Sequence, residues 1–131
     1  MSMELTDLVD AARAAAEGSY SPYSHFKVGA VVVGADGEVF TGANVENAAY
    51  PVGSCAETTA INAAVSHGVR RIDTVAVACV DADGVDDAYP CGECRQIMSE
   101  FGVRRVVVTA GEGSEVREHT LDELLPHRFG L

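Results

Sequence analysis

Two stretches dominate the interpretation of this sequence: Cys55-Ala56-Glu57 and, further along the chain, Pro90-Cys91-Gly92-Glu93-Cys94. Together they supply three thiolates and a carboxylate, a set of groups that suits a catalytic zinc ion. A zinc ion with three protein ligands keeps its fourth position for water, whereas a structural zinc ion fills all four positions with side chains. The sequence therefore predicts a zinc site at Cys55, Cys91 and Cys94, with Glu57 close enough to move protons.

Three other interpretations of these residues remain open at this point. Ser54-Cys55-Ala56-Glu57 fits a capping box, in which Glu57 closes the first turn of a helix. The Cys-x-x-Cys pair also fits a thioredoxin-like redox motif, which leaves Cys55 unexplained. A structural zinc site would need a fourth ligand, which one of the remaining cysteine and histidines would supply: Cys79, His25, His67, His119 or His127.

Length and charge restrict the class of protein. A chain of 131 residues predicts a single domain, spanning 1–131, with one core and one site. Nine basic residues against twenty acidic ones give a formal net charge of −11. This charge opposes binding to polyanions, so we expect no nucleic-acid partner.

The N-terminal residues and the cysteines indicate the compartment. Residues 1–7 show no basic region followed by an apolar stretch, and no run approaches the length of a membrane span. We therefore expect a cytoplasmic protein with no membrane partner, whose reduced thiols serve metal binding or catalysis. Cys79 lies in an apolar run, 75–80, that predicts a buried strand, where a free cysteine behaves as a small hydrophobic residue.

Hydrophobic periodicity predicts alternating helices and strands. The first helix has a cap at Thr6 and a stop at Glu17-Gly18, Gly68 ends the second, and the apolar positions of the first recur at helical spacing: Leu5, Leu8, Val9, Ala12 and Ala15. The predicted elements that follow the first helix are a β-hairpin of 27–33 and 38–41, a helix at 55–67, a strand at 74–80, a loop at 81–89, a helix at 91–101, strands at 104–109 and 116–119, and a helical turn at 121–125. This alternation is typical of layered α/β domains.

Both cysteine motifs fall at predicted helix starts, and this placement has a chemical use. Three thiolates and one Zn²⁺ carry a net negative charge, which weakens the metal as a Lewis acid. Two helix N-termini directed at the sulfurs would offset that charge with their partial positive charges and free amide donors.

Around these motifs the chain resembles the short, zinc-dependent, homotetrameric cytidine deaminases, from about Tyr20 to Phe129. A zinc ligand, one residue and a glutamate, followed by Pro-Cys-x-x-Cys, is the signature of zinc nucleobase deaminases. Residues 20–30 (YSPYSHFKVGA) resemble the family's segment leading into its first strand, and 42–48 (GANVENA) resemble its nucleoside-binding strand end. The resemblance implies a three-layer α/β fold with a mixed central sheet of about five strands flanked by helices.

The same resemblance implies roles for individual residues. Zinc, one ion per chain, binds to the three cysteines of the two motifs, and Glu57 moves the protons while the amine leaves as ammonia. Phe26 packs against the substrate, Asn44 and Glu46 hydrogen-bond the 3′ side of the ribose, and the backbone of Ala56 meets the carbonyl oxygen of the base. In 124–130 (LLPHRFG), Phe129 resembles an aromatic residue that the family inserts into a neighbouring subunit's site.

One position departs from the family pattern. The family usually continues Cys-Ala-Glu with an arginine that hydrogen-bonds the zinc thiolates, and this chain has Thr58 instead. A hydroxyl can donate a hydrogen bond to sulfur but brings no positive charge. We therefore expect that Arg95 or Gln96, which follow Cys94, also supports the zinc ligands.

The resemblance implies hydrolytic deamination of cytidine and deoxycytidine to uridine and deoxyuridine, in pyrimidine salvage. Glu46 in the ribose pocket would repel a phosphate group, which favours nucleosides over nucleotides. The alternatives are a sister deaminase of another aminopyrimidine nucleoside, such as a blasticidin-type antibiotic or a modified cytidine, and a non-catalytic zinc or redox domain. Thr58 keeps the first alternative open.

Overall fold

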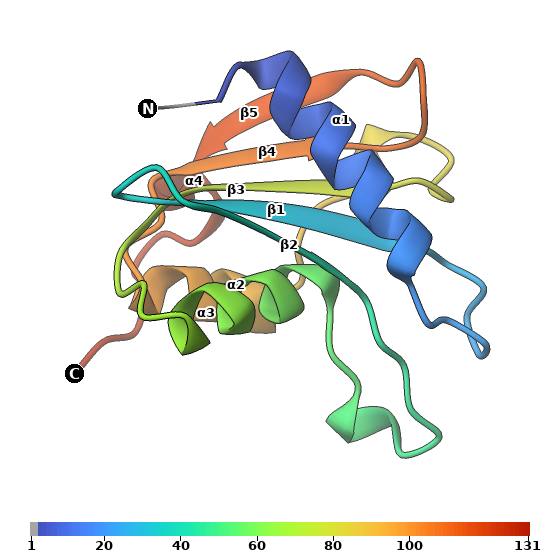
Figure 1. The fold of residues 1–131 in the computed structure, drawn as a ribbon, viewed down its shortest axis with the longest axis horizontal. Helices are drawn as coiled ribbons and strands as arrows, with labels where there is room; N and C mark the ends of the chain where they lie inside the picture. The colour runs from blue at the N-terminus through green and yellow to red at the C-terminus, as the bar shows by residue number, and fades with distance from the viewer. Residues whose placement is uncertain (1–2) are drawn as a thin grey trace.

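Five strands form one mixed sheet in the order β2-β1-β3-β4-β5 (Figure 1). The computed structural model describes residues 3–131. The strands are β1 (Val28–Gly34), β2 (Val39–Ala43), β3 (Ile72–Cys79), β4 (Arg105–Thr109) and β5 (Val116–Thr120). The α-helices are α1 (Leu5–Ala15), α2 (Ala56–Ser66), α3 (Gly92–Glu100) and α4 (Leu121–Leu124), and the short 3₁₀ helices are η1 (Ala16–Gly18), η2 (Tyr50–Val52) and η3 (Val85–Asp87). The sheet and its flanking helices confirm the predicted fold class.

The sheet combines both kinds of strand pairing. β1 and β2 pair antiparallel as the predicted hairpin, and Gly37 in their turn has a φ of 91°, which glycine adopts at little cost. β3 and β4 pair parallel, so the chain crosses between them through α3. The remaining neighbours, β1 with β3 and β4 with β5, are antiparallel.

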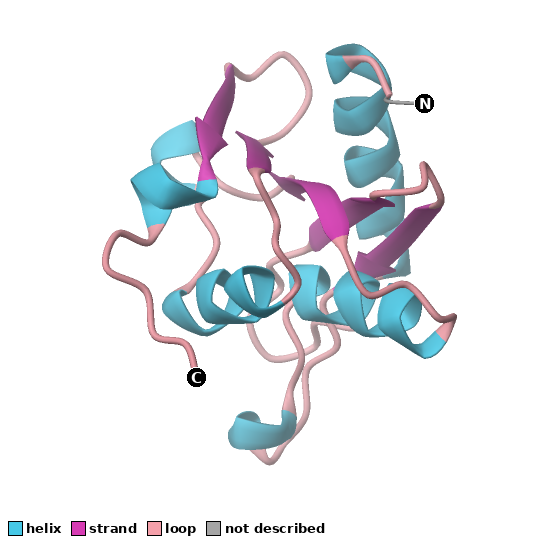
Figure 2. Ribbon diagram, turned by 90° about the vertical axis from the view of Figure 1, so that its left-hand side faces the viewer, coloured by secondary structure: helices cyan, strands magenta, loops and turns pink. Residues whose placement is uncertain are grey.

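Helices cover both faces of the sheet, with α1 on one side and α2 and α3 on the other (Figures 1 and 2). Side chains alternate along each strand, which divides the core into two clusters. Val31 and Val33 of β1 pack in the cluster of α1, whereas Val32 packs in the cluster of α2 and α3. The near-continuous apolar sequences of β1, β3 and β4 follow from this burial on both faces.

Two glycines bring helices directly onto the sheet backbone. A Cβ atom at Gly29 would lie 2.0 Å from the carbonyl oxygen of Ala12 in α1, and one at Gly42 would lie 2.5 Å from the amide nitrogen of Ala60 in α2. Any larger residue would push the helix away from the sheet. Gly42 therefore fixes the position of α2, whose N-terminus carries Cys55.

The cap predicted at Thr6 is wrong. The first helix begins at Leu5 after Glu4, and no side chain caps it, so Thr6 lies inside the first turn. The capping box of this chain lies at α4, where Thr120 and Glu123 exchange hydrogen bonds between side chain and backbone. None of the helices in 3–131 is long and apolar enough to cross a membrane.

Candidate metal centre and substrate pocket

Two cysteines occupy equivalent positions at the starts of two helices. Cys55 is the N-cap residue of α2 and Cys91 is the N-cap residue of α3, both with extended backbone angles. Cys94 follows in the first turn of α3 and is fully buried. Both helix N-termini therefore meet at the sulfur atoms, as the sequence predicts, and their amide dipoles stabilise negative charge there.

The sulfur atoms have the spacing that zinc requires. The Sγ atoms of Cys55 and Cys91 are 3.8 Å apart, and the three Sγ atoms, including that of Cys94, lie within 4.8 Å of one another. Tetrahedral coordination with Zn–S bonds of about 2.3 Å places two sulfurs about 3.8 Å apart. The distance between Cys55 and Cys91 matches this spacing, and all three sulfurs lie close enough together to hold one zinc ion.

The described part of the chain offers this cluster no fourth ligand. In 3–131, no further histidine, cysteine, aspartate or glutamate joins Cys55, Cys91 and Cys94. This arrangement leaves one tetrahedral position for water, which is typical of a catalytic and not of a structural zinc site. The redox interpretation does not account for the third sulfur, that of Cys55, beside the Cys-x-x-Cys pair.

Hydrogen bonds between the thiols prepare one of them for a metal. Hydrogen bonds from Cys94 and Cys91 lower the pKa of Cys55 to about 6 despite its burial. The pKa of Cys94, which donates to Cys55, is raised above its usual range. Burial raises the pKa of Cys79 to about 12, so this fourth cysteine stays a neutral thiol and behaves as the small hydrophobic residue that the sequence predicts.

Glu57 is buried beside the cysteine cluster, with 4 % of its surface exposed. Burial, and secondly the negative charge on Cys55, raise the pKa of Glu57 to about 7. The capping-box interpretation is wrong, because Cys55 and not Ser54 is the N-cap residue, and no side chain caps α2. A carboxyl group with a pKa near neutrality can both accept and donate a proton.

A cavity of about 760 Å³ opens over the cysteines and Glu57. Its lining brings together segments that are distant in the sequence: residues 23–28, 44–47, 50–57, the end of β3, and 87–91. The lining residues are Tyr23, Ser24, Phe26, Val28, Asn44, Val45, Glu46, Asn47, Tyr50, Gly53, Ser54, Cys55, Ala56, Glu57, Cys79, Asp87, Tyr89 and Cys91. The volume falls in the range of small-molecule sites, which is about 300–1,000 Å³.

Asn44 and Glu46 line this cavity, and both also hold the segment that carries Phe26. Asn44 Oδ1 accepts hydrogen bonds from Ser19 Oγ at 2.6 Å and from the amide of Val28 at 2.9 Å, and its Nδ2 donates to the carbonyl oxygen of Phe26 at 2.8 Å. Glu46 Oε1 accepts from the amides of Tyr23 and Ser24 at 3.0 and 3.1 Å, and its Oε2 from the hydroxyl of Ser24. These bonds, that of the Ser24 hydroxyl foremost, keep the pKa of Glu46 below its usual value, so Glu46 is ionised.

Thr58 reaches the metal centre directly. Its Oγ1 lies 3.4 Å from the Sγ of Cys94, within hydrogen-bonding distance of a zinc ligand. Arg95 instead donates to the carbonyl oxygens of Pro90 and Leu124, both at 2.8 Å, so it supports the residue before Cys91. Gln96 donates to the carbonyl oxygen of Phe129 at 3.2 Å. Support of the zinc ligands by Arg95 and Gln96 stays a prediction.

Phe129 lies outside the cavity of its own chain, and its side chain is 69 % exposed. Sequence reasoning did not single out the aromatic residues Tyr23, Tyr50 and Tyr89 or the acidic Asp87, which line the cavity. Of these, only Tyr89 could have been predicted from its neighbours in the sequence, since it directly precedes Pro90 and Cys91 of the cysteine motif. The others reach the cavity through the packing of distant segments.

Comparisons with known proteins agree with this geometry. Residues 3–110 match the model of the family described as the cytidine and deoxycytidylate deaminase zinc-binding region. The chain is 44% identical over 128 residues to a cytidine deaminase of Halalkalibacterium halodurans, covering 97% of this chain and 95% of that protein. It is 44% identical over 117 residues to a cytidine deaminase of Mycobacterium tuberculosis, covering 89% of this chain and 83% of that protein.

A solved structure agrees in fold as well as in sequence. The crystal structure of a cytidine deaminase from Burkholderia pseudomallei superimposes with a TM-score of 0.89 at 44% identity, over 97% of this chain and all of that one. The chain therefore belongs to the family of zinc-binding cytidine and deoxycytidylate deaminases.

Proposed function

We propose that this protein catalyses the hydrolytic deamination of cytidine and deoxycytidine to uridine and deoxyuridine, with release of ammonia. The observation that carries the proposal is the cluster of Cys55, Cys91 and Cys94 beside the buried Glu57, at the floor of a cavity of about 760 Å³. The relatives that bear the name cytidine deaminase support the assignment.

The residues of the site divide the chemistry between them. Cys55, Cys91 and Cys94 would hold zinc, which, when bound, supplies the Lewis acidity that makes water easier to deprotonate. Glu57 takes a proton from the attacking water, transfers it to the ring nitrogen beside the amine-bearing carbon, and then helps the amine leave as ammonia. Phe26 provides an apolar face for the pyrimidine ring, and the backbone of Ala56 meets the carbonyl oxygen of the base.

Charge in the cavity favours nucleosides over nucleotides. Among residues 3–131, those that line the cavity include no lysine or arginine but do include the carboxylates Glu46, Glu57 and Asp87. A 5′-phosphate would enter without a cationic partner and close to negative charge. Asn44 and Glu46 would hydrogen-bond the 3′ side of the ribose, and nothing in this pair selects for a 2′-hydroxyl.

A substrate panel tests this assignment. We expect the zinc-loaded protein to convert cytidine and deoxycytidine with similar kcat/KM, and cytidine 5′-monophosphate with a kcat/KM lower by about 100-fold, which corresponds to about 2.7 kcal/mol of lost transition-state stabilisation. Ultraviolet absorbance follows each reaction directly. Equal turnover of the nucleotide would contradict the role given to the carboxylates.

Thr58 favours a second candidate function within the same chemistry. Because its hydroxyl contacts Cys94 without supplying positive charge, the metal centre differs electrostatically from one with arginine at this position. The candidate is deamination of another aminopyrimidine nucleoside, such as a modified cytidine or a blasticidin-type antibiotic. A higher kcat/KM for such a compound than for cytidine, in the same panel, would favour it.

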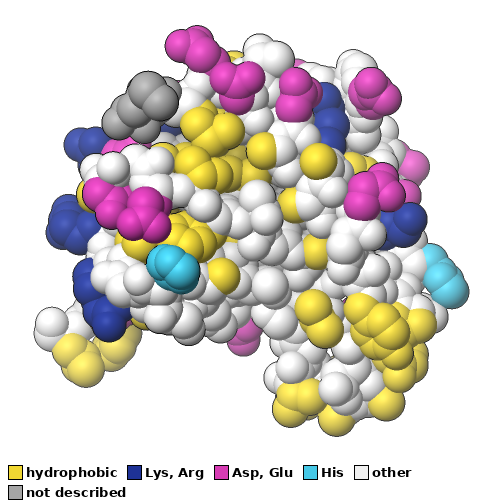
Figure 3. Space-filling model, in the orientation of Figure 1, with side chains coloured by type: hydrophobic (Ala, Val, Ile, Leu, Met, Phe, Trp, Pro, Cys, Tyr) yellow, Lys and Arg dark blue, Asp and Glu magenta, His cyan; other side chains and the backbone are white. Residues whose placement is uncertain are grey.

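We also propose a homotetramer with active sites shared between chains. Large hydrophobic side chains are exposed beside the cavity, and Figure 3 shows hydrophobic atoms gathered over the projecting segment that carries η2. These side chains belong to Tyr20, Tyr23, Val45, Tyr50 and Val52. The exposure of Phe129, which does not line its own cavity, supports this proposal, in which its side chain enters the cavity of a neighbour.

Replacement of Tyr50, which is 74 % exposed, tests the assembly. We expect Tyr50→Asp to reduce the sedimenting mass below that of four chains and to lower turnover of cytidine, because a buried charge without a partner opposes association. Val39→Asp changes an exposed hydrophobic residue on β2 and serves as the matched control. A fully active native monomer would contradict the proposal.

The free thiols support a proposal for the compartment. All four cysteines are free, and a site built from three reduced thiols requires a reducing environment. We therefore propose a cytoplasmic enzyme of pyrimidine salvage.

A further inference from the structure

The segment that connects β3 to α3, residues 81–90, carries one wall of the cavity. Asp87 and Tyr89 of this segment line the cavity, and Cys91, the next lining residue, is a zinc ligand in the proposed function. Regular strand pairing does not hold the segment, which contains only the single turn of η3. Core packing of Val85 and Ala88 holds its middle, and hydrogen bonds at Asp81 and Pro90 hold its two ends.

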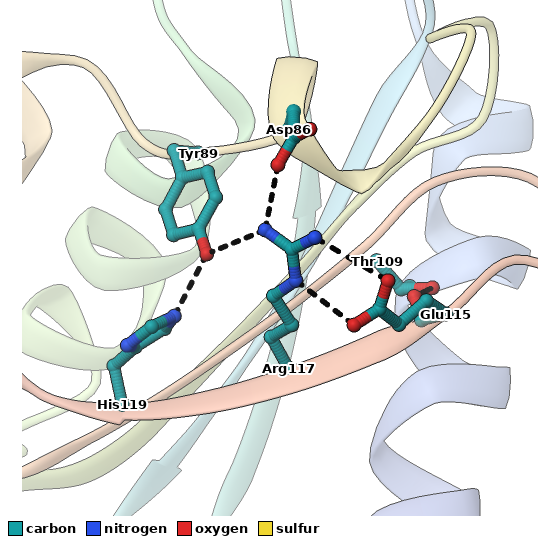
Figure 4. Close-up of polar contacts among 6 residues, drawn as sticks. All are labelled: Asp86, Tyr89, Thr109, Glu115, Arg117 and His119. Atoms are coloured by element: carbon teal, nitrogen blue, oxygen red, sulfur yellow. Dashed lines mark hydrogen bonds and ion pairs between the residues drawn. The ribbon is translucent and has the colours of Figure 1, made fainter.

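The side chains of Asp86 and Tyr89 in this segment are held from the edge strand β5 (Figure 4). Tyr89 Oη lies 2.8 Å from Nε2 of His119, and Nη1 of Arg117 donates to the same Oη at 3.3 Å. The rings of Tyr89 and His119 also pack against each other, with centroids 5.3 Å apart. Arg117 and His119 are two residues apart on β5, so their side chains leave the same face of the strand.

Arg117 is itself held from both sides. Its Nη1 donates to Asp86 Oδ1 at 2.7 Å, within the connecting segment, and its Nε donates to Glu115 Oε2 at 3.0 Å, just before β5. One guanidinium group therefore joins the segment to the edge of the sheet at two points, Asp86 and the hydroxyl of Tyr89. The planar guanidinium holds these partners in a fixed geometry that a lysine would not reproduce.

The hydroxyl of Tyr89 has both of its hydrogen-bond partners on β5. Arginine only donates, so the oxygen of Tyr89 accepts from Arg117, and the same oxygen shares a second hydrogen bond with Nε2 of His119. The phenol hydroxyl therefore points toward Arg117 and His119 (Figure 4), while Tyr89 also lines the cavity.

We propose that Arg117 and His119 are positioning residues that act through Tyr89, fixing its ring as the cavity wall beside Cys91 and thereby setting the affinity for the nucleoside. The proposal rests on the proposed deaminase function. Neither residue lines the cavity, so each contributes only by holding the phenol and, for Arg117, by holding Asp86. Without them the ring keeps its packing against the core but loses both partners of its hydroxyl, and substrate binding bears the entropic cost of ordering it.

Steady-state kinetics with Arg117→Met and Tyr89→Phe test the proposal. We expect each variant to raise the KM for cytidine about tenfold, because each loses a hydrogen bond that involves a charged group. The kcat should stay within about twofold of the native value, and each chain should retain one zinc ion. The double variant should raise KM by less than the product of the single effects, because both changes remove the contact between Arg117 and Tyr89. Tyr89→Phe deletes only the hydroxyl, so it decides the question if Arg117→Met does not fold.

Arg105→Met is the matched control. Arg105 pairs with Glu118 of β5 at 3.0 Å but touches neither Tyr89 nor the cavity, and we expect an unchanged KM. A native KM in Tyr89→Phe would overturn the proposal, as would effects of the two single changes that multiply in the double variant. An equal rise in KM in Arg105→Met would overturn it too, because loss of any positive charge near β5 would then be enough to raise KM.

Hydrogen exchange separates this proposal from the deaminase function. In zinc-loaded protein without substrate, amides in 81–90 should exchange faster in Arg117→Met than in native protein, and at the native rate in Arg105→Met. If the native protein converts no cytidine, the proposed function fails while this result still reports on the anchoring. If cytidine is converted but exchange is unchanged, the positioning role fails alone.

Discussion

Replacement of Glu57 with glutamine is expected to lower kcat for cytidine by about 10³-fold while the fold and the bound zinc are retained. Glutamine has nearly the same shape as the native side chain, so the buried site, in which Glu57 is 4 % exposed, stays filled. It cannot accept a proton from water and return it to the base. Initial rates from ultraviolet absorbance, with metal analysis and circular dichroism on the same sample, measure all three properties.

Glu93 provides the matched control for this change. It lies between two zinc-ligand cysteines in sequence, as close to the metal motif as Glu57, but it is exposed and does not line the cavity. Glu93→Gln should therefore turn over cytidine at a rate near the native one. Undiminished turnover in Glu57→Gln would show that another group moves the protons.

Loss of Cys94 is expected to remove both zinc and activity. Cys94 is the fully buried member of the cluster, and its Sγ contacts the hydroxyl of Thr58. Cys94→Ala leaves only two sulfurs, too few for a stable catalytic zinc site, so zinc content should fall far below one ion per chain and turnover below detection. Elemental analysis of dialysed protein gives the zinc content, and the cytidine assay gives the turnover.

Cys79→Ala is the control for zinc content. Cys79 is also buried, but it lies outside the cluster and keeps a neutral thiol, so this variant should retain one zinc ion per chain. The assignment of the ligands would be wrong if Cys94→Ala bound zinc as the native protein does, or if Cys79→Ala lost it. Loss of zinc without loss of turnover would show that the reaction does not require zinc.

The metal centre was predictable because its information is local. Each cysteine motif is followed by a helix-forming stretch, so its sulfurs lie at a helix N-terminus. The close approach of α2 to the sheet at Gly42 then sets the position of Cys55. Runs of apolar and β-branched residues predicted β1 to β5 for a similar reason, since each strand carries its own pattern of burial.

The rest of the site depends on packing between distant segments, which a single sequence does not reveal. Tyr50 lies among polar and small residues with no pattern of its own, and it reaches the cavity because the segment after β2 folds back toward α2. Arg117 and His119 have the alternation of an ordinary edge strand. Their contacts with Tyr89 exist only because the connecting segment 81–90 lies against β5.

The cap at Thr6 shows how a correct element can carry a wrong boundary. Threonine is a good N-cap residue, and it lies close to the start of the amphipathic pattern. The observed N-cap is instead Glu4, two residues earlier, because burial of Leu8, Val9 and Ala12 against the sheet determines the helix, and the cap adds little.

The most direct test of the catalytic zinc assignment is a titration of metal-free protein with zinc, followed by the loss of the cytidine absorbance band. The account predicts that the rate of deamination rises in proportion to added zinc and stops rising at one ion per chain, since one cluster of three cysteines serves each cavity. Full turnover by protein stripped of metal, or no turnover by folded protein carrying one zinc ion per chain, would contradict it.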